Sequence, residues 1–222
     1  MLMDAQPLPL SATVFHSLSR LAWWTAFFTV VYNFCEGVFA LWAGHIGSSW
    51  GVISFGIDAV AESLSGGVIL WRFAPGIRAD ERERFAQRER RAVVLIGLSF
   101  LVLSMVVFVE AIQRLLGHVH AEEHGLAFIV AGVSLVVKPL LFGMKWYLGQ
   151  RLQSEALRAD AKQTLACAGL SAALLLGLGM NQWFGVWQAD SVLALLIAAV
   201  LVREGFHALR HRHILCCPIS QR

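Results

Sequence analysis

Residues 48–71 of the chain, SSWGVISFGIDAVAESLSGGVILW, form an apolar run that contains two acidic side chains, Asp58 and Glu62. The hydrocarbon core of a bilayer is about 30 Å thick, and about 20 apolar residues cross it as an α-helix. The run is long enough for one crossing, and it lacks the alternation of a barrel strand. It therefore predicts a transmembrane helix with two carboxyl groups inside the membrane.

Six runs of this kind occur along the chain. Their approximate limits are Leu21–Gly44, Ser48–Trp71, Ala92–Leu116, Leu126–Leu148, Ala159–Asn181 and Val186–Phe206. Of the 222 residues, 57% are hydrophobic and 15% are charged, and the mean hydropathy of +0.63 is too high for a water-soluble globule. Because lipid admits only helices and closed barrels, the sequence predicts an all-α membrane protein, a bundle of six transmembrane helices.

The distribution of Lys and Arg predicts the orientation of this bundle. Fifteen of them lie in the second and fourth connections and near the end of the chain, whereas Arg114 alone lies on the opposite side. By the positive-inside rule, both termini lie in the cytoplasm. We expect a cytoplasmic segment over 1–20, the transmembrane domain over 21–208 and a short cytoplasmic tail over 209–222. The segment Asp80–Arg91 alternates acids and arginines, and it predicts a solvated helix at the lipid surface.

Several classes of protein are disfavoured by the sequence. The net charge is only +3, and the basic residues lack interleaved aromatic residues, so no nucleic-acid partner is expected. The sequence has no paired His ligands on one helix, no Gly-flanked nucleophilic Ser and no phosphate loop. We therefore expect neither an enzyme nor a bound cofactor. The four cysteines do not form a disulfide framework, and the N-terminus lacks the basic start of a signal peptide.

The acids of the second run require a functional explanation, since an ionisable side chain costs at least about 2.5–3.5 kcal/mol at a bilayer centre. Asp58 and Glu62 are four residues apart, so they lie on one helix face, one turn from each other. Two carboxylates this close repel each other at low dielectric constant, and a divalent cation or a shared proton would compensate them. The alternative is a pair that only forms packing hydrogen bonds to neighbouring helices.

The fifth run begins with a second polar stripe. Asp160, Gln163 and Cys167 share one helix face at offsets of three and seven residues, and Cys167 lies at a depth similar to that of Glu62. If the two faces meet, Asp58, Glu62, Gln163 and Cys167 would present two carboxylates, an amide oxygen and a potential thiolate, a mixed ligand set that suits zinc in tetrahedral geometry. Taken alone, Cys167 is also typical of a small buried apolar residue, and Gln163 of a helix–helix hydrogen bond.

Three segments resemble the cation diffusion facilitator family, whose six-helix domain exports zinc, cobalt, cadmium, iron or manganese, commonly against protons. Ser49–Ser65 looks like its second helix, Ala156–Cys167 like its fifth, and Trp187–Ser191 like the start of its sixth. The resemblance covers most of residues 20–210. The metal-binding positions of the family fall on four residues, Asp58, Glu62, Gln163 and Cys167.

Three of these positions depart from the family's usual pattern. The family usually has Asp where Glu62 stands, His where Gln163 stands and Asp where Cys167 stands. Gln is a weak ligand that cannot carry a proton, so the departures leave affinity, ion preference and proton stoichiometry open. The family usually also has a cytoplasmic metal-binding domain after the sixth helix. We expect a short, transmembrane-only form without that C-terminal soluble domain.

Further polar residues within the runs could support the site. Glu36, with Asn33 one turn away, is a candidate proton relay or a carboxylate that holds a metal ligand, and a structural anchor is the alternative. Asp160 belongs to the same group of candidates. Lys138 would either neutralise a carboxylate of the site when no metal is bound or snorkel to the interface. Snorkelling explains Glu110.

Two clusters outside the runs contain metal-binding residue types. His118, His120 and His124 lie in the third connection, and His211, His213, Cys216 and Cys217 lie in the tail. The first cluster could collect or release metal outside the cell, and a solvated loop is the alternative. The second could bind zinc or cuprous ion.

The sequence therefore predicts a divalent metal transporter, with zinc as the first candidate and cobalt, cadmium, manganese or iron as others. It would export the ion by alternating access in exchange for protons. The expected partners are the metal ion, protons and the lipid bilayer, and the resemblance makes a homodimer plausible. We expect a multi-pass protein of a bacterial cytoplasmic membrane. The rival interpretation is a membrane scaffold or regulatory protein that kept the fold and lost transport.

Overall fold

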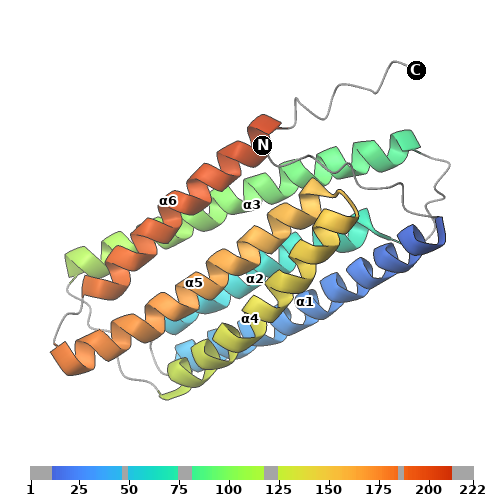
Figure 1. Cartoon of the computed structure of the whole chain (residues 1–222). Helices are drawn as coiled ribbons and strands as arrows, with labels where there is room; N and C mark the ends of the chain where they lie inside the picture. The colour runs from blue at the N-terminus through green and yellow to red at the C-terminus, as the bar shows by residue number, and fades with distance from the viewer. Residues whose placement is uncertain (1–11, 47–49, 75–81, 118–124, 185–187, 212–222) are drawn as a thin grey trace, which may run out of the picture.

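The structure, a computed structural model, describes residues 12–46, 50–74, 82–117, 125–184 and 188–211 (Figure 1). Every regular element in this part of the chain is an α-helix, which confirms the predicted all-α fold. The six helices are α1 (Ala12–Ile46), α2 (Trp50–Arg72), α3 (Arg82–Gly117), α4 (Gly125–Arg151), α5 (Glu155–Phe184) and α6 (Gln188–His211). Each helix covers one of the six apolar runs.

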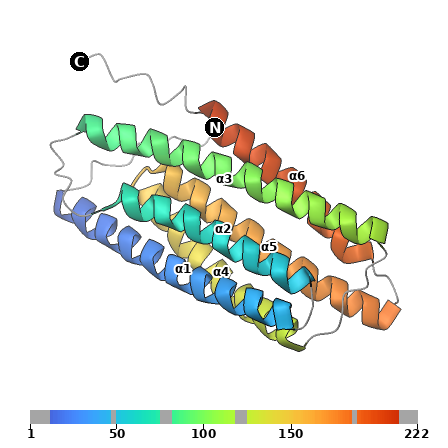
Figure 2. The same ribbon diagram turned by 180° about the vertical axis from the view of Figure 1, so that it is seen from behind.

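The two helices that carry the predicted ligands, α2 and α5, lie in the middle of the bundle. Figure 1 shows α3 and α6 on one side of them and α1 and α4 on the other. The view from behind in Figure 2 shows the same order, with α2 between α1 and α3. The most extensive contacts join α1 to α2, α3 to α6 and α4 to α5, and α2 also contacts α5. The predicted ligands are thus covered from both sides.

Large apolar side chains lie outside the bundle, and polar ones lie inside it. Trp24, Phe28 and Phe34 of α1 are 55%, 56% and 59% exposed, whereas Glu62 and Lys138 are 0% exposed. A soluble monomer rarely exposes so large an apolar surface, whereas lipid solvates it. Among the described residues, α1, α3, α4 and α6 are long and apolar enough to cross a membrane. By this criterion α2 and α5, the helices with the polar stripes, are not among them.

A glycine pair brings α1 close to α2. A Cβ added to Gly56 would lie 2.8 Å from Leu41 Cγ and 3.1 Å from the carbonyl oxygen of Gly37. Small residues allow such close approach, and a larger side chain at this point would push the helices apart. The contact places Glu36 and Asp58, which are neighbours of the two glycines in sequence, in the same part of the bundle.

A buried ion pair joins the end of α2 and the first turns of α3 to the start of α5. Arg72 Nε donates to Glu89 Oε2 at 2.5 Å. Glu89 Oε1 accepts hydrogen bonds from Ser154 Oγ at 3.0 Å and from the Ala156 backbone N–H at 2.8 Å. The Leu157 N–H donates in turn to Ser154 Oγ at 3.2 Å. Glu89 and Ser154 thus cap α5, whose first N–H groups have no partner within the helix.

This contact corrects the prediction for Asp80–Arg91. Residues 82–91 are the first turns of α3 and not a separate surface helix, and Glu89 is only 8% exposed. The solvated interpretation was wrong for Glu89 because charged and capping partners on two other helices hold it inside the bundle. The first helix likewise begins at Ala12 and not at Leu21, so it extends into the segment expected before the transmembrane domain.

Candidate metal centre

Two contacts between α2 and α5 fix the register of one helix against the other, and with it the relative positions of the predicted ligands along the bundle. The Cys167 thiol donates to Asp58 Oδ1 at 3.4 Å, and Ser65 Oγ donates to Asp160 Oδ1 at 2.7 Å. Later residues of α2 meet earlier residues of α5, so the helices are antiparallel. The other two predicted ligands lie between these contacts, at one common level. The structure therefore brings the two polar stripes face to face.

Glu62 lies beside an ammonium group from α4. Lys138 Nζ is 3.3 Å from Glu62 Oε2 and 3.4 Å from Glu36 Oε2. The same ammonium lies 5.2 Å from the centroid of the Phe55 ring, within the range of a cation–π contact. Lys138 is 0% exposed near the middle of α4, so its side chain does not snorkel to an interface.

Glu36 is held at its other carboxylate oxygen. Its Oε1 accepts hydrogen bonds from the Tyr32 hydroxyl at 3.2 Å and from Ser134 of α4. Its Oε2 accepts no hydrogen bond within the described ranges. Asn33 is 0% exposed, and neither polar atom of its side chain has a hydrogen-bond partner in the part of the chain that the structure describes. The structure thus joins Glu36 to α4 and does not join it to Asn33 through a side-chain hydrogen bond.

Gln163 is turned toward α3. Ser99 Oγ donates to its Oε1 at 3.1 Å. Of the four predicted ligands, Asp58 and Cys167 are the pair in direct contact in the described structure. No three His, Cys, Asp or Glu side chains converge as a metal site among residues with described positions. The Lys138 ammonium offers a physical reason, because it supplies positive charge that the carboxylates would otherwise draw from a bound cation.

Asp160 belongs to a separate polar cluster, nearer the start of α5. Its Oδ2 lies 2.8 Å from Lys145 Nζ, which also donates to Thr164 Oγ1 at 2.8 Å. Ser65 Oγ donates to the other carboxylate oxygen of Asp160, so the cluster joins α2, α4 and α5. Because both of its oxygens face partners, the geometry favours a role for Asp160 in holding the three helices together.

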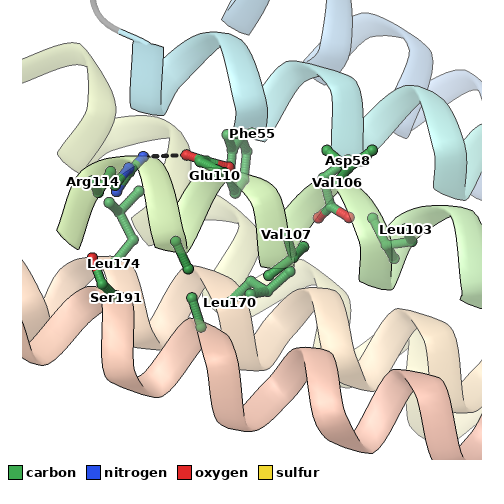
Figure 3. Close-up of a pocket in the computed structure, with 12 residues that line it drawn as sticks. Phe55, Asp58, Leu103, Val106, Val107, Glu110, Arg114, Leu170, Leu174 and Ser191 are labelled. Atoms are coloured by element: carbon green, nitrogen blue, oxygen red, sulfur yellow. Dashed lines mark hydrogen bonds and ion pairs between the residues drawn. The ribbon is translucent and has the colours of Figure 1, made fainter. Parts of the chain in front are cut away.

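A cavity of about 60 Å³ leads away from Asp58 (Figure 3). It is bounded by α2, α3, α5 and α6, and its walls include Leu170 and Ser191. Asp58 lies at one end, and Glu110, paired with Arg114, lies toward the other (Figure 3). A space of this size holds a few water molecules. Glu110 therefore lines a cavity as part of an ion pair.

The partners that α4 contributes were missed in the sequence, apart from Lys138. Ser134 and Lys145 lie four residues before and seven residues after Lys138, on the same helix face. That polar stripe in the fourth run is the signal that predicts them. Tyr32 stands in the same relation to Glu36, four residues before it.

The predicted accessory metal residues lie almost entirely outside the described residues. This holds for His118, His120, His124, His213, Cys216 and Cys217. His211 is the last residue of α6, and its backbone alone is described.

Comparison with known proteins gives one family. The profile of the cation efflux transmembrane domain matches residues 25–212. Transmembrane protein 163 of Xenopus laevis is 26% identical over 191 residues, which is 86% of this chain and 66% of that protein. A Dictyostelium discoideum protein named as a probable zinc transporter is 26% identical over 178 residues, 74% of this chain and 28% of that protein. The cation-efflux pump FieF of Salmonella typhi is 22% identical over 190 residues, 83% of this chain and 62% of that pump. The chain thus spans less than two thirds of the length of each of these relatives.

Proposed function

This chain is a multi-pass membrane protein of the cation efflux family, and we propose on that basis that it exports a divalent metal ion, with zinc as the first candidate. The ion would bind between α2 and α5 and leave on the side opposite the cytoplasm. The names of the Dictyostelium and Salmonella relatives, a probable zinc transporter and a cation-efflux pump, support this class of substrate.

The observation that carries the proposal is the position of Asp58. Asp58 is 5% exposed, and one of its carboxylate oxygens accepts a hydrogen bond from the Cys167 thiol of α5. The other oxygen, Oδ2, has no hydrogen-bond partner in the described structure, and Asp58 lines the end of a cavity. Burial of a carboxylate at such a depth carries a high desolvation cost, and in membrane proteins such a residue usually marks an ion pathway. A buried oxygen without a partner, on a residue that lines a cavity, retains the capacity to coordinate a cation.

The proposed ligands are Asp58 and Glu62 on α2 and Gln163 and Cys167 on α5. The antiparallel register supports this assignment, since it places Asp58 beside Cys167 and, one helical turn further along, Glu62 at the level of Gln163. Gln163 Oε1 would exchange its hydrogen bond from Ser99 for the ion. Two carboxylates, an amide oxygen and a thiolate are a borderline ligand set, which favours zinc over the harder manganese ion.

The arrangement along the bundle supports export. The cavity extends from Asp58 toward the end of α3 that the positive-inside rule places outside the cell. Toward the cytoplasmic end, the Lys145–Asp160 pair and then the Arg72–Glu89 pair fill the interior. In an alternating-access cycle, the carboxylates would release protons to bind the ion inside and regain them outside. The homodimer and the bacterial membrane are further parts of this proposal.

Zinc efflux from proteoliposomes tests the proposal. Asp58→Asn and Glu62→Gln keep side-chain volume and remove a negative charge, and each is expected to reduce zinc efflux at least about tenfold, equivalent to about 1.4 kcal/mol. Glu155→Gln is the matched control, because Glu155 is an acid with a 49% exposed side chain at the start of α5. Wild-type efflux in both site variants would overturn the proposal.

The rival function is a membrane scaffold that retains the fold without transport. Two observations favour it, namely Gln163 in place of the usual His and the Lys138 ammonium beside Glu62. Titration calorimetry with zinc on the purified protein separates the two functions. A transporter is expected to bind zinc at about micromolar strength in a manner that Asp58→Asn abolishes, whereas a scaffold would give no Asp58-dependent heat.

A further inference from the structure

The Lys138 ammonium lies between two carboxylates at almost equal distance. Its Nζ is 3.3 Å from Glu62 Oε2, on α2, and 3.4 Å from Glu36 Oε2, on α1. The two carboxylates differ in position. Glu62 lies at the level of Gln163 on α5, whereas Glu36 accepts a hydrogen bond from Ser134 of α4. Asp58 lies one helical turn before Glu62 on α2 and accepts a hydrogen bond from Cys167.

We propose that Lys138 is an intramolecular competitor of the transported ion, whose ammonium neutralises Glu62 in the absence of the ion and moves onto Glu36 when the ion binds. This inference rests on the proposed function and deepens it. Lysine suits such an exchange because its ammonium is a compact charge on a flexible stem. The two distances are so similar that the transfer requires a change in side-chain torsion and no movement of a helix.

The Glu36 carboxylate is oriented to accept the Lys138 ammonium. Tyr32 and Ser134 donate to its Oε1, so the carboxylate is fixed in orientation. Its Oε2 accepts no hydrogen bond within the described residues and points at Lys138. A carboxylate with one satisfied oxygen and one that faces only an ammonium can accept that ammonium fully without losing another partner.

The formal charges of the cluster match a divalent ion. With Cys167 as the thiol that donates to Asp58, Glu36, Asp58 and Glu62 contribute three negative charges and Lys138 one positive charge, which leaves two negative charges in a buried region. A divalent cation cancels that remainder, whereas a monovalent ion leaves it half compensated at low dielectric constant. Lys138 would therefore set the charge of the ion that the site accepts and would help displace the ion at release.

A purely structural ion pair is the alternative to be excluded. In that case Lys138 would only hold α4 against α1 and α2, and its removal would weaken folding without strengthening metal binding. A competitor predicts the opposite change in affinity, because removal of a positive charge near the ligands makes the site more attractive to a cation. The sign of the affinity change therefore separates the two roles.

The experiment is a double-mutant cycle on the full chain, read out by titration calorimetry with zinc alone. Lys138→Met is expected to bind zinc at least about tenfold more tightly than the wild type. Glu36→Gln is expected to bind it at least about threefold more weakly, because the ammonium loses its second acceptor and stays on Glu62. In the Lys138→Met background, Glu36→Gln is expected to weaken binding less than it does in the wild type, because only the loss of one nearby negative charge remains. Lys162→Met, which removes an ammonium paired with Glu204 at the α5–α6 contact, is the matched control and is expected to bind as the wild type does.

Further variants and outcomes keep the test decisive. Lys138→Gln serves if Lys138→Met does not fold, and Lys138→Arg, which keeps the charge, is expected not to tighten binding. Unchanged or weaker zinc affinity in both uncharged variants would overturn the competitor role. Equal weakening by Glu36→Gln in both backgrounds would also overturn it, because Glu36 would then be a direct ligand. If the wild type and every Lys138 variant fail to bind zinc in an Asp58-dependent manner, the proposed function fails, and this inference fails with it.

Discussion

Among individual residues, Cys167 has the most specific consequence for ion preference. Its thiol is fully buried and donates to Asp58 Oδ1, so it lies where the α2 and α5 stripes meet. A thiolate favours soft and borderline ions, whereas a hydroxyl is a harder and weaker ligand. The sulfur atom should therefore decide between cadmium or zinc on one side and manganese on the other.

Cys167→Ser tests this preference. Serine keeps the hydrogen-bond donor to Asp58, so the helix contact is retained. We expect cadmium and zinc affinity to fall at least about tenfold, or about 1.4 kcal/mol, while manganese affinity changes much less. Titration calorimetry with each ion gives the comparison, and Cys35→Ser, at an exposed cysteine of α1, is the control. A uniform loss for all three ions would mean that sulfur does not contribute to selectivity.

The same residues illustrate what a sequence can predict about a site. Asp58, Glu62, Gln163 and Cys167 were predicted as ligands because charged and polar groups in apolar runs are rare and their helical spacing is regular. Ser99 was not found as a partner of Gln163, because it comes from another helix and spacing along one helix carries no information about rotation between helices. Lys138 was expected either to neutralise a carboxylate of the site or to snorkel, and the sequence did not say which carboxylate. Lys138 was noticed as a charge, but its position between Glu36 and Glu62 depends on how α1, α2 and α4 pack.

Among the helices, the junction of α2, α3 and α5 is where the structure departs most from expectation. Apolar runs predicted the helices and their order correctly, since length and hydropathy are properties of each run alone. The start of α3 was misjudged because an alternating charged segment favours solvent unless a buried partner exists. That partner, Arg72, and the cap that Glu89 forms on α5 depend on tertiary contacts.

Glu89→Ala tests the importance of this junction for stability. The substitution removes the carboxylate that Arg72 contacts at 2.5 Å and one cap of α5. We expect a loss of about 3–5 kcal/mol, the usual cost of breaking a buried ion pair. Ser154→Ala, which removes the hydroxyl cap alone, is expected to cost about 1 kcal/mol. Thermal unfolding in detergent measures both.

The control for this pair is Glu155→Ala, an exposed acid next to the cap, whose effect should stay within about 0.5 kcal/mol. If Glu89→Ala were no more destabilising than Glu155→Ala, the junction would not hold the three helices together. The proposed closure of the cytoplasmic end would then lose its main structural support.

For the molecule as a whole, the interior of the bundle differs on the two sides of Glu62. On the predicted cytoplasmic side of Glu62, the Lys145–Asp160 and Arg72–Glu89 pairs fill the interior with partnered charges. On the other side, a cavity extends from Asp58 to the Glu110–Arg114 pair. The proposed release of the ion toward the outside rests on this asymmetry.

Blocking the cavity should therefore slow release without changing the ligands. Ala194 of α6 lines the cavity, and Ala194→Phe would fill part of its space. We expect zinc affinity to change by less than about threefold, while efflux from proteoliposomes falls at least about tenfold, because the barrier to exit rises by about 1.4 kcal/mol or more. Ala199→Phe adds the same ring to the exposed face of α6 and should leave efflux unchanged. If Ala194→Phe transported as fast as Ala199→Phe, the ion would leave by a route other than this cavity, and the outward direction inferred from it would be wrong.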